Sequence, residues 1–195
     1  MRRRAEILRS DSPAEYCASA ESGRQPNRSD DGAFPPYTFA VRNRFMERAI
    51  QLSVDNVVQG RGGPFGAVIV RAHEIIAEGA NSVTMRNDPT AHAEVTAIRE
   101  ACSKLGTFEL RGCELYSSCE PCPMCLGAIY WAHLDRVYFA GNALDASQAG
   151  FSDAFIYREI SRPPSARSIP MVQMMHSEAL EAFRVWEKQP NKITY

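Results

Sequence analysis

The sequence has no apolar run approaching the about 18 residues needed to span a bilayer. It also lacks a basic stripe, and its 195 residues carry a formal net charge of −1 at pH 7. A protein that holds a long polyanion usually concentrates positive charge, so this balance favours a small-molecule substrate. No apolar stretch of about 7–15 residues follows Arg2–Arg4, which argues against a secretory signal. We therefore expect a cytoplasmic protein that binds neither membrane nor nucleic acid.

Large apolar residues are also scarce over residues 1–36, which are rich in Arg, Ser, Asp, Glu and Pro. Such a segment buries too little surface to offset the entropy lost when it becomes ordered. We predict a disordered N-terminal tail over residues 1–36 and one domain over residues 37–195. The alternative is that the natural protein starts near Ala40 or Val41, which mass spectrometry of that protein would distinguish.

Six cysteines are present, and three of them, Cys119, Cys122 and Cys125, have C-x2-C-x2-C spacing. An even number of cysteines suits disulfides in a secreted protein, but clustered spacing without a secretory signal indicates metal binding. His92 lies thirty residues before Cys122. His92, Cys122 and Cys125 would make a three-ligand zinc site with an open fourth position, as in catalytic zinc. The sequence therefore predicts one zinc ion per subunit.

Glu94, two residues after His92, is the predicted catalytic residue. A carboxylate beside the metal can carry protons between water and substrate. The combination H-x-E followed by P-C-x-x-C is a signature of zinc-dependent nucleobase deaminases. The sequence thus predicts an enzyme that removes an exocyclic amino group from a heterocyclic ring.

Two other metal sites and one geometric question stay open at this point. Cys119 as a fourth ligand would make the zinc structural, whereas an iron–sulfur site would need a fourth downstream cysteine that the sequence lacks. In a regular helix, His92 and Glu94 would point about 200° apart. Spacing alone therefore does not place both side chains at one metal.

Apolar periodicity predicts alternating helices and strands. Helices are expected at residues 41–60, 88–105, 121–133, 152–160 and 177–188, and strands at residues 65–71, 74–81, 113–119, 136–141 and 169–175. The first two strands suit an antiparallel hairpin, and the helices between the later strands favour parallel pairing. We predict an α/β fold, a three-layer α/β/α sandwich around a five-stranded mixed sheet.

Several segments resemble a known family. Residues 64–70 (PFGAVIV), 88–94 (DPTAHAE) and 118–125 (SCEPCPMC) resemble the cytidine deaminase superfamily. Residues 127–132 (GAIYWA), 150–157 (GFSDAFIY) and the end of the chain are, more narrowly, similar to bacterial guanine deaminases. The resemblance extends from about residue 40 to the last residue.

The resemblance implies a cytidine deaminase-like fold and the hydrolysis of guanine to xanthine and ammonia in purine catabolism. It also implies a homodimer in which the C-terminal segment is swapped onto the partner's active site. By the same resemblance, Asn81, Asp153 and Tyr195 contact the purine. Phe65 is expected to stack on the ring, and Trp131 to approach from the neighbouring subunit. Each residue also has a plainer alternative. Asn81 would be a turn residue, Asp153 a helix-terminal carboxylate and Tyr195 a frayed chain end. Phe65 and Trp131 would pack in the core.

Three other functions stay open. The same zinc core serves deaminases of other free bases or nucleosides, such as guanosine or cytosine. A tRNA adenosine deaminase would need cationic surface to hold phosphates, against which the net charge of −1 argues. A zinc-stabilised interaction module would leave Glu94 and the open ligand position without a role, and chelation would unfold it.

Overall fold

The structure of the protein is a computed structural model that describes residues 42–194. Its helices and strands are α1 (Arg44–Val58), β1 (Gly66–Arg71), β2 (Glu74–Ala80), α2 (Val83–Arg86), α3 (Ala93–Leu105), β3 (Cys113–Cys119), α4 (Pro123–Trp131), β4 (Arg136–Gly141), α5 (Ala143–Gln148), α6 (Ala154–Ile160), the 3₁₀ turn η2 (Pro164–Ala166) and α7 (His176–Glu187). The predicted tail over residues 1–36 and the last residue, Tyr195, lie outside the described range. No helix within that range is long and apolar enough to cross a membrane.

The described residues form a four-stranded mixed sheet in the order β2-β1-β3-β4. Strand β1 pairs antiparallel with both β2 and β3, and β3 pairs parallel with β4. The predicted α/β class, the hairpin and a parallel pair of later strands are therefore confirmed.

The predicted fifth strand, over residues 169–175, is wrong. The segment has no regular secondary structure, and Ile169 and Val172 are 74% and 79% exposed. A strand needs a sheet edge to pair its backbone N–H and C=O groups. The described sheet does not include this segment, so its apolar side chains have no sheet face to cover.

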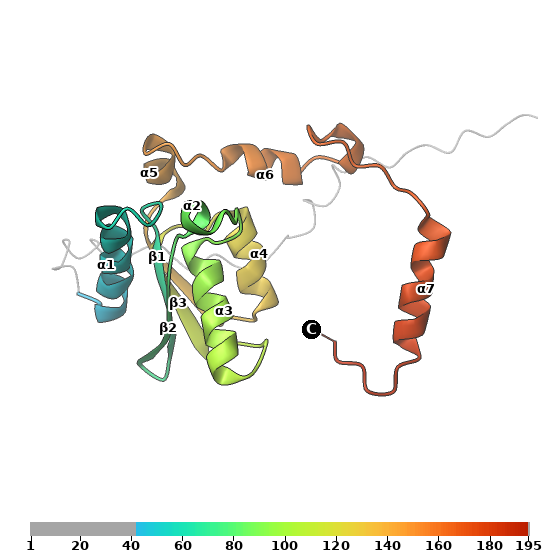
Figure 1. Cartoon of the computed structure of the whole chain (residues 1–195), viewed down its shortest axis with the longest axis horizontal. Helices are drawn as coiled ribbons and strands as arrows, with labels where there is room; N and C mark the ends of the chain where they lie inside the picture. The colour runs from blue at the N-terminus through green and yellow to red at the C-terminus, as the bar shows by residue number, and fades with distance from the viewer. Residues whose placement is uncertain (1–41, 195) are drawn as a thin grey trace, which may run out of the picture. The chain divides into compact units, whose positions relative to one another are not determined.

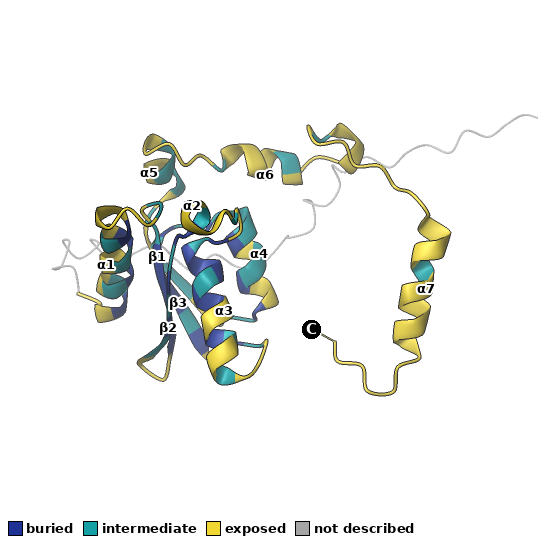
Figure 2. Ribbon diagram, viewed as in Figure 1, coloured by how far each residue is buried: buried dark blue, intermediate teal, exposed yellow. Residues whose placement is uncertain are grey.

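Alternate residues of β1 belong to two different buried clusters, and the sheet lies between helices α1 and α3 (Figure 1). Val68 and Val70 are buried in a cluster with Phe45 of α1. Ala67 and Ile69 belong to a second cluster, built mainly with residues of α3 and α4. Figure 2 shows the buried residues concentrated on the strands and on the helix faces that meet them. The predicted three-layer sandwich is thus confirmed, with α1 on one face of the sheet and α3 and α4 on the other.

Side-chain caps and turns decide where the helices begin. The Asn43 side chain accepts a hydrogen bond from Phe45 N at 2.9 Å, which starts α1. The helix predicted from residue 88 begins instead at Ala93. The Asp88 carboxylate accepts from Thr90 N and Oγ1, at 2.8 and 2.7 Å, and so closes a turn rather than a helix.

The sequence does not predict α2 or α5, because helices of four and six residues are too short to show an apolar period. Helix α5 depends on a capping box between Asn142 and Asp145. Helix α7 begins at His176, one residue before its predicted start. Ser177 lies inside the helix, where its hydroxyl donates to Glu178.

Candidate metal centre and active site

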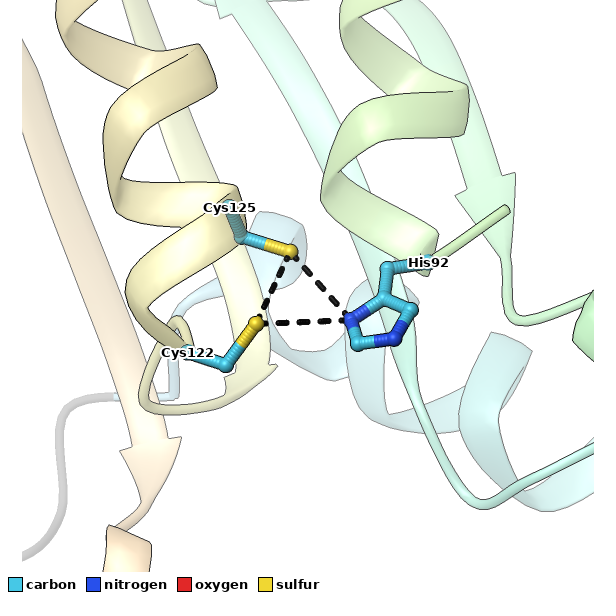
Figure 3. Close-up of side chains that lie close together, drawn as sticks. All are labelled: His92, Cys122 and Cys125. Atoms are coloured by element: carbon cyan, nitrogen blue, oxygen red, sulfur yellow. Dashed lines mark hydrogen bonds between the residues drawn. The ribbon is translucent and has the colours of Figure 1, made fainter. Parts of the chain in front are cut away.

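Two helix starts bring three metal-binding side chains together (Figure 3). His92 is the extended cap residue of α3 and Cys122 is that of α4, with Cys125 in the first turn of α4. Pro123 occupies the first turn of α4, where a missing N–H costs no helical hydrogen bond. Unpaired N–H groups and the positive end of the helix dipole favour thiolates at this turn.

The spacing of the ligand atoms suits tetrahedral zinc. His92 Nδ1 lies 3.5 Å from Cys122 Sγ and 3.4 Å from Cys125 Sγ, and the two sulfur atoms are 3.6 Å apart. Zinc bonds of about 2.3 Å to sulfur and about 2.0–2.1 Å to nitrogen hold such atoms about 3.5–3.8 Å apart in a tetrahedron. The three predicted ligands therefore fit the metal in both chemistry and spacing.

Cys119 does not belong to this group. Its Sγ faces the carbonyl oxygen of Asn142 at 3.7 Å. The candidate metal group found among residues 42–194 consists of His92, Cys122 and Cys125. Three protein ligands leave the fourth tetrahedral position for water or substrate, as in catalytic zinc. An iron–sulfur cluster, commonly held by four cysteines, does not suit this donor set.

The two thiols of the group differ in acidity. The hydrogen bond between Cys122 and Cys125, followed by the contact with His92, lowers the pKa of Cys122 to about 4. The same contact with Cys122, together with burial, raises the pKa of Cys125. The hydrogen bond to Cys122 also raises the pKa of His92. The cluster thus stabilises negative charge on sulfur, which a divalent cation would neutralise.

Glu94 reaches the same centre because α3 starts only after His92. The backbone of His92 is extended, with φ −70° and ψ 159°. The angle of about 200° between residues two apart in a regular helix therefore does not apply to His92 and Glu94. Glu94 Oε2 lies 3.5 Å from Cys125 Sγ, and the residue is 6% exposed. Burial is the main cause that raises the pKa of Glu94. A raised pKa makes a carboxylate a stronger base than a free one, which suits a group that carries protons.

A cavity of about 600 Å³ opens onto His92, Glu94 and Cys122. Its volume lies within the range of about 300–1,000 Å³ that is usual for small-molecule pockets. Gly63 and residues 150–153 contribute further parts of its wall. None of the described residues that line it is Lys or Arg. The cavity therefore suits an uncharged ligand better than one that carries phosphate.

Asn81 lines this cavity at the end of β2. Its Oδ1 accepts from the backbone N–H groups of Gly63 and Val83, at 3.3 and 3.4 Å. These two donors orient the amide, and Nδ2 has no hydrogen-bond partner among residues 42–194. Asn81 Oδ1 thus holds the backbone of the turn, as the plainer alternative expected, and the Asn81 amino group is left as a donor for a ligand.

The other predicted substrate contacts fall into three groups. Phe65 and Asp153 line the same cavity as Asn81. The Asp153 side chain does not cap α6, and burial raises its pKa. Trp131 is 64% exposed and lines a separate groove on α3 and α4. Tyr195 lies outside the described residues.

Two cavity residues escape the sequence reasoning. Phe151 meets Phe65 edge-on, with ring centroids 5.0 Å apart and an interplanar angle of 87°. Glu120 Oε2 accepts from Ala143 N at 3.0 Å, at the first residue of α5. Both residues lie within segments that carry the family resemblance, but only the fold shows that they face the cavity.

Comparisons with known proteins agree with this site. Residues 40–141 match the family described as the cytidine and deoxycytidylate deaminase zinc-binding region. The chain is 56% identical to guanine deaminase from Bacillus subtilis (strain 168) over 151 residues, which are 77% of this chain and 97% of that protein. The X-ray structure of guanine deaminase from Bacillus subtilis superposes with a TM-score of 0.76 at 55% identity, over 78% of this chain and 97% of that chain. A tRNA-specific adenosine deaminase from Aquifex aeolicus (strain VF5) is 48% identical over 92 residues, which are 47% of this chain and 60% of that protein.

Proposed function

Because this chain belongs to the cytidine and deoxycytidylate deaminase zinc-binding family and is a zinc-dependent hydrolytic deaminase, we propose that it converts guanine to xanthine and ammonia. The observation that carries this proposal is the shared cavity. It is lined by Glu94, two of the metal ligands (His92 and Cys122), Asn81, Phe65 and Asp153. The similarity to guanine deaminase over most of the chain supports the choice of substrate.

The reaction needs one metal ion and one proton carrier. His92, Cys122 and Cys125 would hold zinc, which supplies Lewis-acid chemistry and lowers the pKa of water to about 7. Glu94 takes a proton from the attacking water and delivers it to the ring nitrogen beside the amino-bearing carbon. The water oxygen forms the new C–O bond, the C–N bond to the amino group breaks, and a proton passed by Glu94 leaves with ammonia.

The wall of the cavity offers complementary groups to a purine. Asn81 Nδ2 donates to a ring acceptor, and the Asp153 carboxylate accepts from ring N–H groups. The ring of Phe65, supported edge-on by Phe151, provides a face for stacking. The absence of Lys and Arg from the described lining residues favours a free base over a nucleotide or a tRNA phosphate backbone.

We further propose a homodimer in which the C-terminal segment and Tyr195 reach the partner's cavity and Trp131 meets the partner. Support comes from apolar side chains that the described chain leaves uncovered: Phe183 and Val172 are 65% and 79% exposed. Large exposed apolar surface is typical of interaction sites. The thiol ligands must stay reduced, which suits the cytoplasm.

The test is ammonia release from guanine, compared with guanosine, cytosine, cytidine and adenosine, by zinc-loaded full-length protein. We expect strong preference for guanine. Turnover of another member of the panel with guanine inert would keep the deaminase chemistry but overturn the substrate and the roles given to Asn81 and Asp153. A chelated sample serves as the control, because it should stay folded and release no ammonia.

A further inference from the structure

Asn56, on the buried side of α1, lies outside the cavity wall but joins two parts of it. The residue is 3% exposed. Its Nδ2 donates to the carbonyl oxygens of Gly63 and Asn81, both at 2.8 Å. Gly63 and Asn81 line the cavity, whereas Asn56 does not. Because an amide NH₂ group has two hydrogens, each carbonyl takes one of them.

The two carbonyls belong to segments that are distant in the sequence, the turn after α1 and the end of β2. Gly63 N also donates to Asn81 Oδ1, so the turn contacts both the backbone and the side chain of Asn81. Asn81 N donates in turn to Phe65 O at 3.0 Å. Hydrogen bonds with Asn56 and Phe65 therefore hold the backbone of Asn81 at its carbonyl and at its N–H. The position of this backbone in turn sets the position of the Asn81 side-chain amide.

The junction has no spare space. A Cβ atom at Gly62 would collide with the Asn81 carbonyl oxygen and would also press against Asn56 Nδ2. A shift of the turn is thus resisted by contact on one side and by the Asn56 hydrogen bonds on the other. Loss of the Asn56 amide would remove the Asn56 hydrogen bond from the Asn81 carbonyl, and would leave the Gly63 carbonyl with Phe65 N as its donor. The Asn81 side chain would then be free to reorient.

We infer that Asn56 is a positioning residue that orients Asn81 and thereby sets substrate affinity without touching the substrate. The inference rests on the proposed function, in which Asn81 Nδ2 donates to the purine. It predicts that removing Asn56 weakens guanine binding only as long as Asn81 is present to be oriented.

A double-mutant cycle tests this dependence. The full-length zinc-loaded wild type, Asn56→Ala, Asn81→Ala and the double variant are compared by KM and kcat for guanine. We expect Asn56→Ala to raise KM about tenfold, with a smaller change in kcat, as the loss of an oriented neutral hydrogen bond predicts. In the Asn81→Ala background the same change should raise KM less than about twofold. Factors that multiply, or a fall in kcat at unchanged KM, would overturn the inference.

A matched control separates positioning from general destabilisation. Ser53 lies on the same helix, is 8% exposed and donates only locally, to Ile50 O at 2.7 Å. Ser53→Ala should leave KM unchanged, and zinc content should be equal in all five proteins. If Asn56→Ala does not fold, Asn56→Ser, which keeps one donor, takes its place in the cycle with the same expected non-additivity.

The outcome is distinguishable from failure of the proposed function. If the wild type leaves guanine unchanged and deaminates another base, the substrate proposal fails and the cycle is measured on that base. Non-additivity would then still support the positioning role, and additivity would still reject it. If guanine is bound without turnover, the Kd of guanine replaces KM in the same comparison.

Discussion

Two regions of the molecule differ in how far they bury their apolar side chains. They are the sheet region, residues 42–141, and the C-terminal region, residues 143–194. In the first region, apolar side chains close two buried clusters around the sheet. In the second, α5, α6 and α7 contain no buried residue (Figure 2). Large apolar side chains there, such as Phe183, are exposed. The first region thus has buried apolar clusters of its own, whereas helices α5, α6 and α7 leave their apolar side chains exposed.

The two regions also divide the site between them. The metal ligands and Glu94 come from the sheet region, and Phe151, Asp153 and Ile156 come from the C-terminal region. The family match ends at residue 141, so the part shared across the family is the part that holds the chemistry. The comparison teaches that the sheet region carries the residues expected to set the type of reaction. The C-terminal region contributes part of the cavity wall.

The largest expected effect removes the chemistry and leaves both regions folded. Glu94→Gln should lower ammonia release from guanine by about 10²–10⁴-fold, because the amide cannot carry a proton. Zinc content, measured by atomic absorption, should be unchanged. Glu100→Gln, an exposed change on the same helix, is the matched control. Normal turnover in Glu94→Gln would remove this residue from the mechanism.

A substitution in α7 should weaken self-association through the C-terminal region and leave the metal site unchanged. Covering a phenylalanine contributes about 1.5–3 kcal/mol, so Phe183→Ser should weaken self-association by roughly 10–100-fold. Sedimentation velocity over a range of protein concentrations measures this change. Lys188→Ser, an exposed substitution just after α7, should leave association unchanged. A wild type that sediments as a monomer at all concentrations would contradict the proposed homodimer.

The chain end provides a smaller effect in the same region. Deleting Tyr195 should raise KM for guanine about tenfold with little change in zinc content, because the proposed hydrogen bond of Tyr195 to the purine would be lost. Steady-state ammonia release gives KM and kcat separately. Tyr195→Phe tells the hydroxyl from the ring. Unchanged turnover and KM after the deletion would return Tyr195 to the class of frayed chain ends.

The smallest expected effect lies in the sheet region, between α1 and β2. Arg48 Nε donates to Glu78 Oε1 at 2.7 Å, and this hydrogen bond is the main cause that lowers the pKa of Glu78 from its ordinary 4.5. Because the pKa is lower in the folded state, the pair stabilises the protein above pH 4.5 and loses this contribution as pH falls through the folded-state pKa. Both side chains are more than a third exposed, so the contribution should stay below about 1 kcal/mol.

Urea unfolding of Glu78→Gln at pH 7 and pH 3 measures that contribution. The variant should be less stable than the wild type at pH 7, and the difference should shrink at pH 3. Glu74→Gln, an exposed substitution on the same strand, is the matched control. An equal difference at both pH values would show that the pair contributes no titratable stability.

The sequence predicts β3 and β4 with their observed bounds, because β-branched and apolar residues between turn signals are a local property. It fails at residues 169–175, where the same local pattern finds no sheet edge. It also places the start of α3 too early, since the Asp88 turn competes with helix formation. Local patterns thus predict elements well where the fold supplies a partner surface.

The sequence by itself predicts the chemistry of the site, with His92, Cys122 and Cys125 as expected metal ligands and Glu94 as the expected proton carrier. Residue type and short spacing at two helix starts are sufficient for that, because metal preference follows from donor atoms. Only the tertiary structure decides that Glu94 faces the thiols, that Asn81 keeps its amino group free and that Phe151 joins the cavity. These features depend on hydrogen bonds and packing between residues far apart in the chain, which no local pattern contains.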